Sequence, residues 1–81
     1  MTKDDAANPK FQLGDYVWVK ASAPGKYLDI ESGDICGSFV IKDEAIAQKF
    51  DEPIGCLMYI VEAGCGEDLE IPEQYLEFET D

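Results

Sequence analysis

The fold of this chain is decided by one stretch near its end, Gly66-Glu67-Asp68-Leu69-Glu70-Ile71-Pro72-Glu73-Gln74-Tyr75-Leu76-Glu77-Phe78. Apolar and acidic side chains alternate on both sides of its proline, and this alternation is typical of short strands with one buried and one polar face. Pro72 has no amide hydrogen to give to a sheet, so it ends the first strand and begins a turn that carries Tyr75. The stretch therefore predicts a strand, a turn and a second strand.

Residues 16–20, Tyr-Val-Trp-Val-Lys, give the clearest strand pattern in the first half of the chain. β-Branched and aromatic residues favour strands. Side chains along a strand point alternately to opposite faces, so Val17 and Val19 share one face. Tyr16 and Trp18 share the opposite face. We expect the two valines to face the core.

Residues 55–63 form the most apolar run, and we expect them to be the central strand. At this length, the content of tyrosine, isoleucine and valine favours a strand over a helix. Either face of the strand can be the buried one, because apolar residues occur on both: Leu57, Met58, Ile60 and Val61.

The segment before the central strand predicts two weaker strands joined by a hairpin. Residues 26–30 give the first, Ser32-Gly33 the turn, and residues 35–42 the second. Gly37 interrupts the second strand and predicts a bulge or a sharp bend, which a small barrel needs at its corners.

Residues 43–50 are the one window with a helical pattern. Asp43 suits the N-cap position, and Ile46 and Phe50 lie four residues apart on one face. Pro53 prevents the helix from continuing. Two turns are too short to be stable alone, so we expect this helix to pack against the sheet.

Five or six short strands with one short helix, in 81 residues, predict a small, mainly β barrel. We expect a single domain over residues 11–81, preceded by a flexible N-terminal arm at residues 1–10. The expected core consists of Val17, Val19, Ile35, Phe39, Ile41, Met58 or Leu57, Ile60 or Val61, Leu69, Ile71 and Leu76.

Two segments resemble the SH3-like barrel superfamily. Residues 13–19 look like the opening strand of bacterial SH3-like barrel proteins, and residues 69–77 are similar to the closing strand, short 3-10 turn and last strand of SH3 domains. In SH3 domains the proline and tyrosine of this turn help to form a groove for Pro-rich peptides, and Pro72 and Tyr75 match these positions. The only tryptophan, Trp18, lies in the first strand and not near mid-chain, so the resemblance implies the fold more than the ligand.

The charge of the chain is large and uneven. Eighteen acids against six lysines give a net charge of −12, with no histidine and no arginine. Residues 50–81 hold ten of the acids and no base. Nucleic acid and anionic membranes are poor direct partners for such a surface, because both are bound through lysine and arginine. A basic protein surface or divalent cations would be attracted. Solubility alone is the competing explanation of the acidity.

No catalytic residue, cofactor or metal site is expected. Cys36, Cys56 and Cys65 form no Cys-x-x-Cys pair, and without histidine they lack a base that would make a thiol nucleophilic. We expect three buried or half-buried structural thiols in a reducing cytoplasm. The alternative is one exposed thiol, Cys65, because glycines flank it in an expected turn. Residues 29–34 resemble part of a calcium loop, but their glycine is out of register with the EF-hand pattern, which favours a polar hairpin turn.

An exposed aromatic strip is the best candidate site. Tyr16 and Trp18 share a strand face, and SH3-like barrels place the turn that carries Tyr75 near that strand. Large aromatic side chains dominate binding hot spots, although they can also form the outer core of a small barrel. The candidate partner-binding residues are Tyr16, Trp18, Tyr59, Pro72 and Tyr75, with an acidic rim of Glu67, Glu70, Glu73 and Glu77.

Two functions remain open, because a third, a small enzyme or metal-dependent subunit, is disfavoured by the absence of histidine and of catalytic motifs. The first is a protein-interaction module or accessory subunit that binds a basic protein partner through the aromatic strip and acidic rim. The second is an acidic inhibitor that imitates nucleic acid, as some proteins of phages and mobile elements do. Binding by the inhibitor would weaken steeply as salt rises, whereas an interface anchored by aromatic residues would weaken less.

Overall fold

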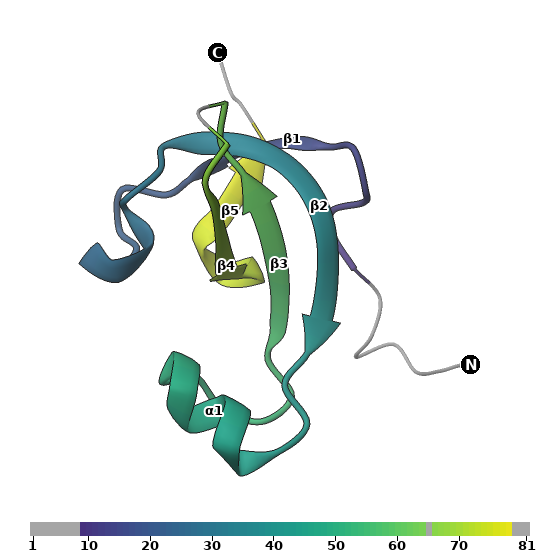
Figure 1. Ribbon diagram of the computed structural model, residues 1–81, viewed down its shortest axis with the longest axis vertical. Coiled ribbons are helices and arrows are strands. Elements are labelled where there is room, and N and C mark those ends of the chain that lie inside the picture. Colours follow the sequence, from purple (N-terminus) through teal and green to yellow (C-terminus); the bar gives the residue numbers. More distant parts are fainter. Residues whose placement is uncertain (1–8, 65, 79–81) are drawn as a thin grey trace.

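A computed structural model describes residues 9–64 and 66–78 of the chain. The described residues form a mainly β fold, with five antiparallel strands in one sheet of order β4-β3-β2-β1-β5. One short α-helix and two 3-10 turns complete this part of the chain (Figure 1). The elements are β1 (Tyr16–Val19), η2 (Gly25–Tyr27), β2 (Ser32–Val40), α1 (Glu44–Phe50), β3 (Leu57–Glu62), β4 (Asp68–Pro72), η3 (Glu73–Tyr75) and β5 (Leu76–Phe78). The predicted fold class is confirmed, as is the strand–turn–strand order of the last segment.

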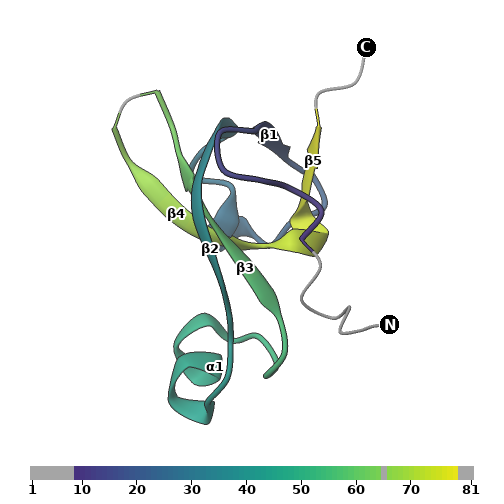
Figure 2. The same ribbon diagram turned by 90° about the vertical axis from the view of Figure 1, so that its right-hand side faces the viewer.

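The long strand β2 joins the two parts of the sheet. Its first residues pair with β1, where Trp18 lies opposite Ser32, and its remaining residues pair with β3 as far as Val40. The ladder between β2 and β3 shifts register between Ile35 and Gly37, so the predicted bulge is present. Figure 1 shows β2 curving over β3, and Figure 2 shows the edge strands β4 and β5 on opposite sides of the molecule.

The hairpin predicted before β2 is wrong. Ser32 and Gly33 belong to β2 itself, and residues 26–30 contain the 3-10 turn η2 in place of a strand. A β-carbon on Gly33 would lie 2.3 Å from the carbonyl oxygen of Glu62, so glycine is required there because β2 and β3 approach closely, and not for a turn. Tyr27 of η2 is buried in the core, which explains why this segment curls inward and does not pair in the sheet.

The core lies on the inner face of the curved sheet. Val17, Ile35, Ile71 and Leu76 are buried as predicted. On β3 the face of Tyr59 and Val61 points into this core, whereas Met58 on the opposite face is buried elsewhere. Val19, Leu57 and Leu69 are only partly buried and pack against this core. The core also contains five residues absent from the predicted set: Phe11, Ala23, Tyr27, Ile30 and Tyr59. Ile41 and Met58 are buried outside this cluster.

The helix α1 occupies the predicted window. Asp43 caps its N-terminus, since its side chain accepts a hydrogen bond from the amide of Ile46 at 2.9 Å. The ring of Phe50 packs against Phe39 of β2, with ring centroids 5.9 Å apart. The helix lies at the end of the molecule where β2 ends and β3 begins (Figures 1 and 2). Over the described residues, no helix has the length and apolar character that crossing a membrane requires.

The N-terminal segment is attached to η3 from Lys10 onward. The amide of Lys10 donates to Glu73 at 2.8 Å, and the amide of Phe11 donates to the Tyr59 hydroxyl at 3.1 Å. The same Tyr59 hydroxyl donates to Glu73 at 2.8 Å. Most of the arm predicted for residues 1–10 lies outside the described residues.

Candidate functional site

Tyr16 and Trp18 form an aromatic pair on the outer face of β1. Val17 points into the core, so its two neighbours point outward. Their ring centroids lie 6.2 Å apart with an interplanar angle of 83°, an edge-to-face arrangement. Tyr16 remains 49% exposed, and a 2.6 Å hydrogen bond between its hydroxyl and that of Ser32 holds the ring on β2.

A row of side chains continues from Tyr16 across the sheet. Tyr16 lies opposite Asp34 of β2, Asp34 opposite Glu62 of β3, and Glu62 opposite Asp68 of β4. Directly opposed residues project from the same face of a sheet, and all four of these are exposed. We call these four residues the outer row: one aromatic ring followed by three carboxylates. Like charges directly opposite one another destabilise a sheet, so this row is costly to the fold.

Trp18 lies beside the outer row, between two polar neighbours. It is opposite Ser32 on β2 and opposite Glu77 on β5. The ring is half-buried, and within the described residues its indole N–H is buried without a hydrogen-bond acceptor. An unpaired buried donor costs about 1–3 kcal/mol, so this position is not optimised for stability either.

The thiol of Cys36 borders the outer row at the bulge of β2. It donates a hydrogen bond to the Glu62 carboxylate at 3.4 Å. Partial desolvation, this hydrogen bond and the negative charges of Glu62, Asp34 and Asp68 all raise the pKa of the thiol. The pKa of Cys56 is also raised, by burial and by the charges of Glu52 and Glu73. A thiol with a raised pKa is a poor nucleophile at neutral pH, and both cysteines are free. Cys56 is half-buried as expected, whereas Cys36 is exposed, which corrects the expectation of a buried thiol, and Cys65 lies outside the described residues.

The structure brings only two of the five candidate aromatic-strip residues together. Tyr75 is half-buried and packs against Tyr27, with ring centroids 5.6 Å apart, instead of joining Trp18. Tyr59 and Pro72 require a correction, because both are fully buried and offer no side-chain surface to a partner. Tyr59 fills the core, and its hydroxyl is used by Phe11 and Glu73.

The four predicted rim glutamates are dispersed. Glu77 lies opposite Trp18, so it does border the aromatic pair. Glu73 is half-buried and occupied by Tyr59 and Lys10, and Glu70 lies opposite Ile60. Glu67 is exposed and lines a separate depression of about 370 Å³.

The carboxylates that do adjoin the aromatic pair were missed in the sequence. Asp34, Glu62 and Asp68 stand 28 and 6 positions apart along the chain, and only the strand register brings them into one row. The signal available was weak: each residue lies next to an apolar neighbour that faces the core. Such alternation identifies the outward face but not the neighbour across the sheet.

For the outer row with Trp18, neither a metal-binding cluster among the described residues nor a matching protein was found that would assign a ligand. Among residues 9–64 and 66–78, no group of three or more His, Cys, Asp or Glu side chains could hold a metal ion. Residues 29–34 run into β2, so they form neither a calcium loop nor the hairpin turn that was favoured over it. Comparison of the chain with family models, curated proteins and solved structures gave no match.

Proposed function

We propose that this protein is a binding module that recognises a basic protein partner through the outer row and Trp18. The observation that carries the proposal is the register that joins the exposed Tyr16 and the half-buried Trp18 to three carboxylates on one sheet face. The net charge of −12 would draw a basic partner toward this surface. The cost of aligning three carboxylates also supports a role outside folding.

The two parts of the surface have different roles in this proposal. Tyr16 and Trp18 supply the apolar contact area, and their ring faces attract lysine and arginine side chains. Asp34, Glu62 and Asp68 select a basic partner and speed its association. Aromatic contacts hold the partner and therefore set how slowly it leaves.

Membership of the SH3-like barrel superfamily is part of the proposal. It is supported by the strand order β4-β3-β2-β1-β5 and by the position of η3 between β4 and β5, the turn that the resemblance requires. We do not extend it to Pro-rich ligands. Pro72 is buried and Tyr75 packs on Tyr27, so the two residues that match the SH3 groove do not present one surface.

We also propose that the protein works by binding and not by catalysis, in a reducing cytoplasm. The raised pKa values of Cys36 and Cys56 support this, because they make both thiols weak nucleophiles and both are free. A thiol that remains protonated is also slower to oxidise.

The test begins with partners captured from the source lysate and ranked by basic surface. For a captured partner, Trp18→Ala should weaken binding by roughly 2 kcal/mol, chiefly through faster dissociation. Leu13→Ala is the matched control, because Leu13 is an apolar residue with 76% exposure outside the site. Unchanged affinity for Trp18→Ala would contradict the proposal.

The acidic inhibitor is the second candidate, and the three aligned carboxylates favour it. Strands lie about 4.8 Å apart, so the row offers regularly spaced negative charge, as a nucleic acid backbone does. In this case the partner would be a nucleic-acid-binding protein. Reversing Glu62 and Asp68 to lysine would abolish its binding while Trp18→Ala would have little effect, and the affinity would fall steeply with salt.

A further inference from the structure

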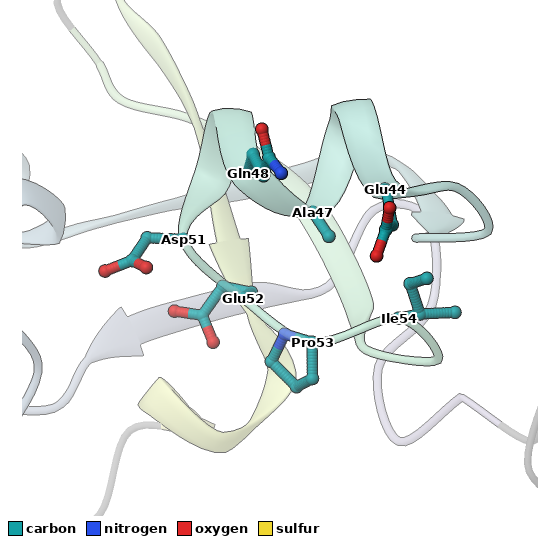
Figure 3. Close-up of a pocket in the computed structure, with 7 residues that line it drawn as sticks. All are labelled: Glu44, Ala47, Gln48, Asp51, Glu52, Pro53 and Ile54. Atoms are coloured by element: carbon teal, nitrogen blue, oxygen red, sulfur yellow. The ribbon is translucent and has the colours of Figure 1, made fainter.

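The helix α1 and the segment that follows it enclose a second surface feature, distant in the fold from β1. A groove of about 460 Å³ runs between the helix and residues 52–54. Its apolar lining is formed by Ala47, Pro53 and Ile54, and the Ile54 side chain is 54% exposed. Figure 3 shows Ile54 beside Glu44 at one end, Ala47 and Pro53 in the middle, and the carboxylates of Asp51 and Glu52 at the other end.

Asp51 is a costly residue for its position. It ends α1 in the left-handed conformation, with φ of 57° and ψ of 43°, where glycine or asparagine is preferred. It also places a negative charge at the helix C-terminus, where the exposed carbonyl groups are themselves negative. The helix dipole therefore disfavours a negative charge here, although aspartate tolerates the left-handed backbone, and a charge that opposes helix stability in this way is a candidate for function.

Glu52 is held in place at the same end of the groove. Its carboxylate accepts a hydrogen bond from the Tyr27 hydroxyl at 3.0 Å, and Tyr27 is anchored in the core. A carboxylate fixed in this way loses less conformational freedom when a cation binds. The head group of Lys26 donates a hydrogen bond to the carbonyl oxygen of Phe50 at 2.7 Å.

We propose that this groove binds a lysine or arginine side chain carried by an extended segment of a partner protein. The alkyl part of such a side chain would cover Ala47, Pro53 and Ile54, and its charged end would lie between Asp51 and Glu52. The groove is open along its length, which suits one side chain of a larger partner. A free small molecule binds tightly only when most of its surface is enclosed. The site is separate from the outer row and stands whether or not that surface binds a partner.

The test uses a seven-residue peptide with one central lysine among glycine and serine, titrated into the whole protein at low salt. We expect the peptide to shift the NMR signals of the Ala47 and Ile54 methyl groups. The control peptide has norleucine in place of lysine, which keeps the alkyl chain and removes the charge. Asp51→Asn should raise Kd about tenfold, as expected for one charge-assisted hydrogen bond. Asparagine tolerates the left-handed conformation, so melting should be unchanged or higher.

Two further variants separate this site from general attraction to an acidic protein. Ala47→Leu fills the middle of the groove without changing charge and should also weaken binding. Asp29→Asn removes an acid from the separate depression that Glu67 lines, and Trp18→Ala changes the aromatic pair. Each of these two variants should leave the Kd of the lysine peptide unchanged. Equal binding of the norleucine peptide, or an unchanged Kd for Asp51→Asn, would overturn the proposal. If spermidine bound more tightly than the lysine peptide, the proposed ligand, a side chain of a partner protein, would be wrong. A free polyamine would then be the better ligand.

Discussion

The inner and outer faces of the sheet are built on the same strands, but apolar packing dominates the inner face and aligned charges dominate the outer face. On the inner face, Val17, Val61 and Ile71 have no exposed surface and pack into one apolar cluster. On the outer face, the strand register aligns the carboxylates of Asp34, Glu62 and Asp68, and Trp18 keeps a buried N–H group that has no acceptor among the described residues. The apolar burial of the inner face lowers the free energy of the folded state, whereas the aligned carboxylates and the unpaired N–H group of the outer face raise it. The comparison teaches that stability alone explains only one side of these strands.

The largest effect is expected on the inner face. Ile71→Ala should lower the free energy of unfolding by about 2–4 kcal/mol, because it leaves a cavity in the core. Val19 is only partly buried, so Val19→Ala should cost less than Ile71→Ala. Urea denaturation measures both, and Leu13→Ala, a substitution at a 76% exposed position, is the control. If Ile71→Ala were as mild as Leu13→Ala, the inner face would not be the core.

A smaller loss is expected from one oxygen atom inside the core. Tyr59→Phe removes the hydroxyl that accepts from Phe11 and donates to Glu73. The amide of Phe11 would be left without its partner, which costs about 1–3 kcal/mol. The ring itself stays, so any loss measured by thermal melting comes from these hydrogen bonds. Tyr16→Phe, which removes a hydroxyl from the outer face, should cost less.

The same hydroxyl predicts an alkaline limit to stability. Burial, opposed by the hydrogen bond from the Phe11 amide and aided by Glu73, raises the pKa of Tyr59 to about 12. A raised pKa means that the folded state favours the protonated phenol, so its contribution is complete below about pH 10 and is lost as pH rises toward 12. Melting temperature measured from pH 8 to 12 should fall above pH 10, and the fall should be shallower in Tyr59→Phe. If the melting temperature fell equally with pH in the unchanged protein and in Tyr59→Phe, the Tyr59 hydroxyl would not cause the alkaline loss of stability.

On the outer face a substitution is expected to raise the free energy of unfolding instead of lowering it. Glu62→Gln removes the central carboxylate of the outer row and should stabilise the fold by about 0.2–1 kcal/mol. Salt screens this repulsion, so the gain should shrink as ionic strength rises. Glu67→Gln is the matched control, because Glu67 is exposed outside the row. A loss of stability in Glu62→Gln would mean that the row is held by contacts that favour the fold.

The smallest expected effect is a change in the rate at which Cys36 is alkylated. Glu62 raises the pKa of the Cys36 thiol by accepting its hydrogen bond and by its charge. In Glu62→Gln the charge is gone, so iodoacetamide should alkylate Cys36 faster at pH 8, as followed by mass spectrometry. Cys56, whose pKa is raised by burial and by Glu52 and Glu73, is the internal reference and should keep its rate.

The sequence predicted those parts of the fold that depend on local patterns. Alternation placed Val17 and Ile71 in the core, and a capping aspartate with a helical face located α1. Gly33 was misread because a glycine that opens a turn and a glycine that admits a neighbouring backbone look alike in one dimension. Tyr27 and Tyr59 were left out of the core because their hydroxyl groups find partners only in the folded chain.

The candidate site could be predicted in part. Tyr16 and Trp18 were identified because strand alternation decides their face. Their acidic neighbours were not, since the pairing of β2 with β3 and of β3 with β4 sets which carboxylates meet. The groove at α1 was also missed. Asp51 reads as an ordinary acid after a helix until its backbone conformation is known.

The edge-to-face pair on β1 gives the molecule a built-in optical reporter. Trp18 is the only tryptophan in the chain, so all indole fluorescence originates at the proposed binding surface. Tyr16, whose ring centroid is 6.2 Å away, is close enough to pass its excitation energy to the indole. A partner that covers the pair would change the polarity around the half-exposed ring and shift its emission, while binding in the groove at α1 would leave the emission unchanged. The emission wavelength of the unlabelled protein can therefore distinguish binding at the outer row from binding in the groove at α1.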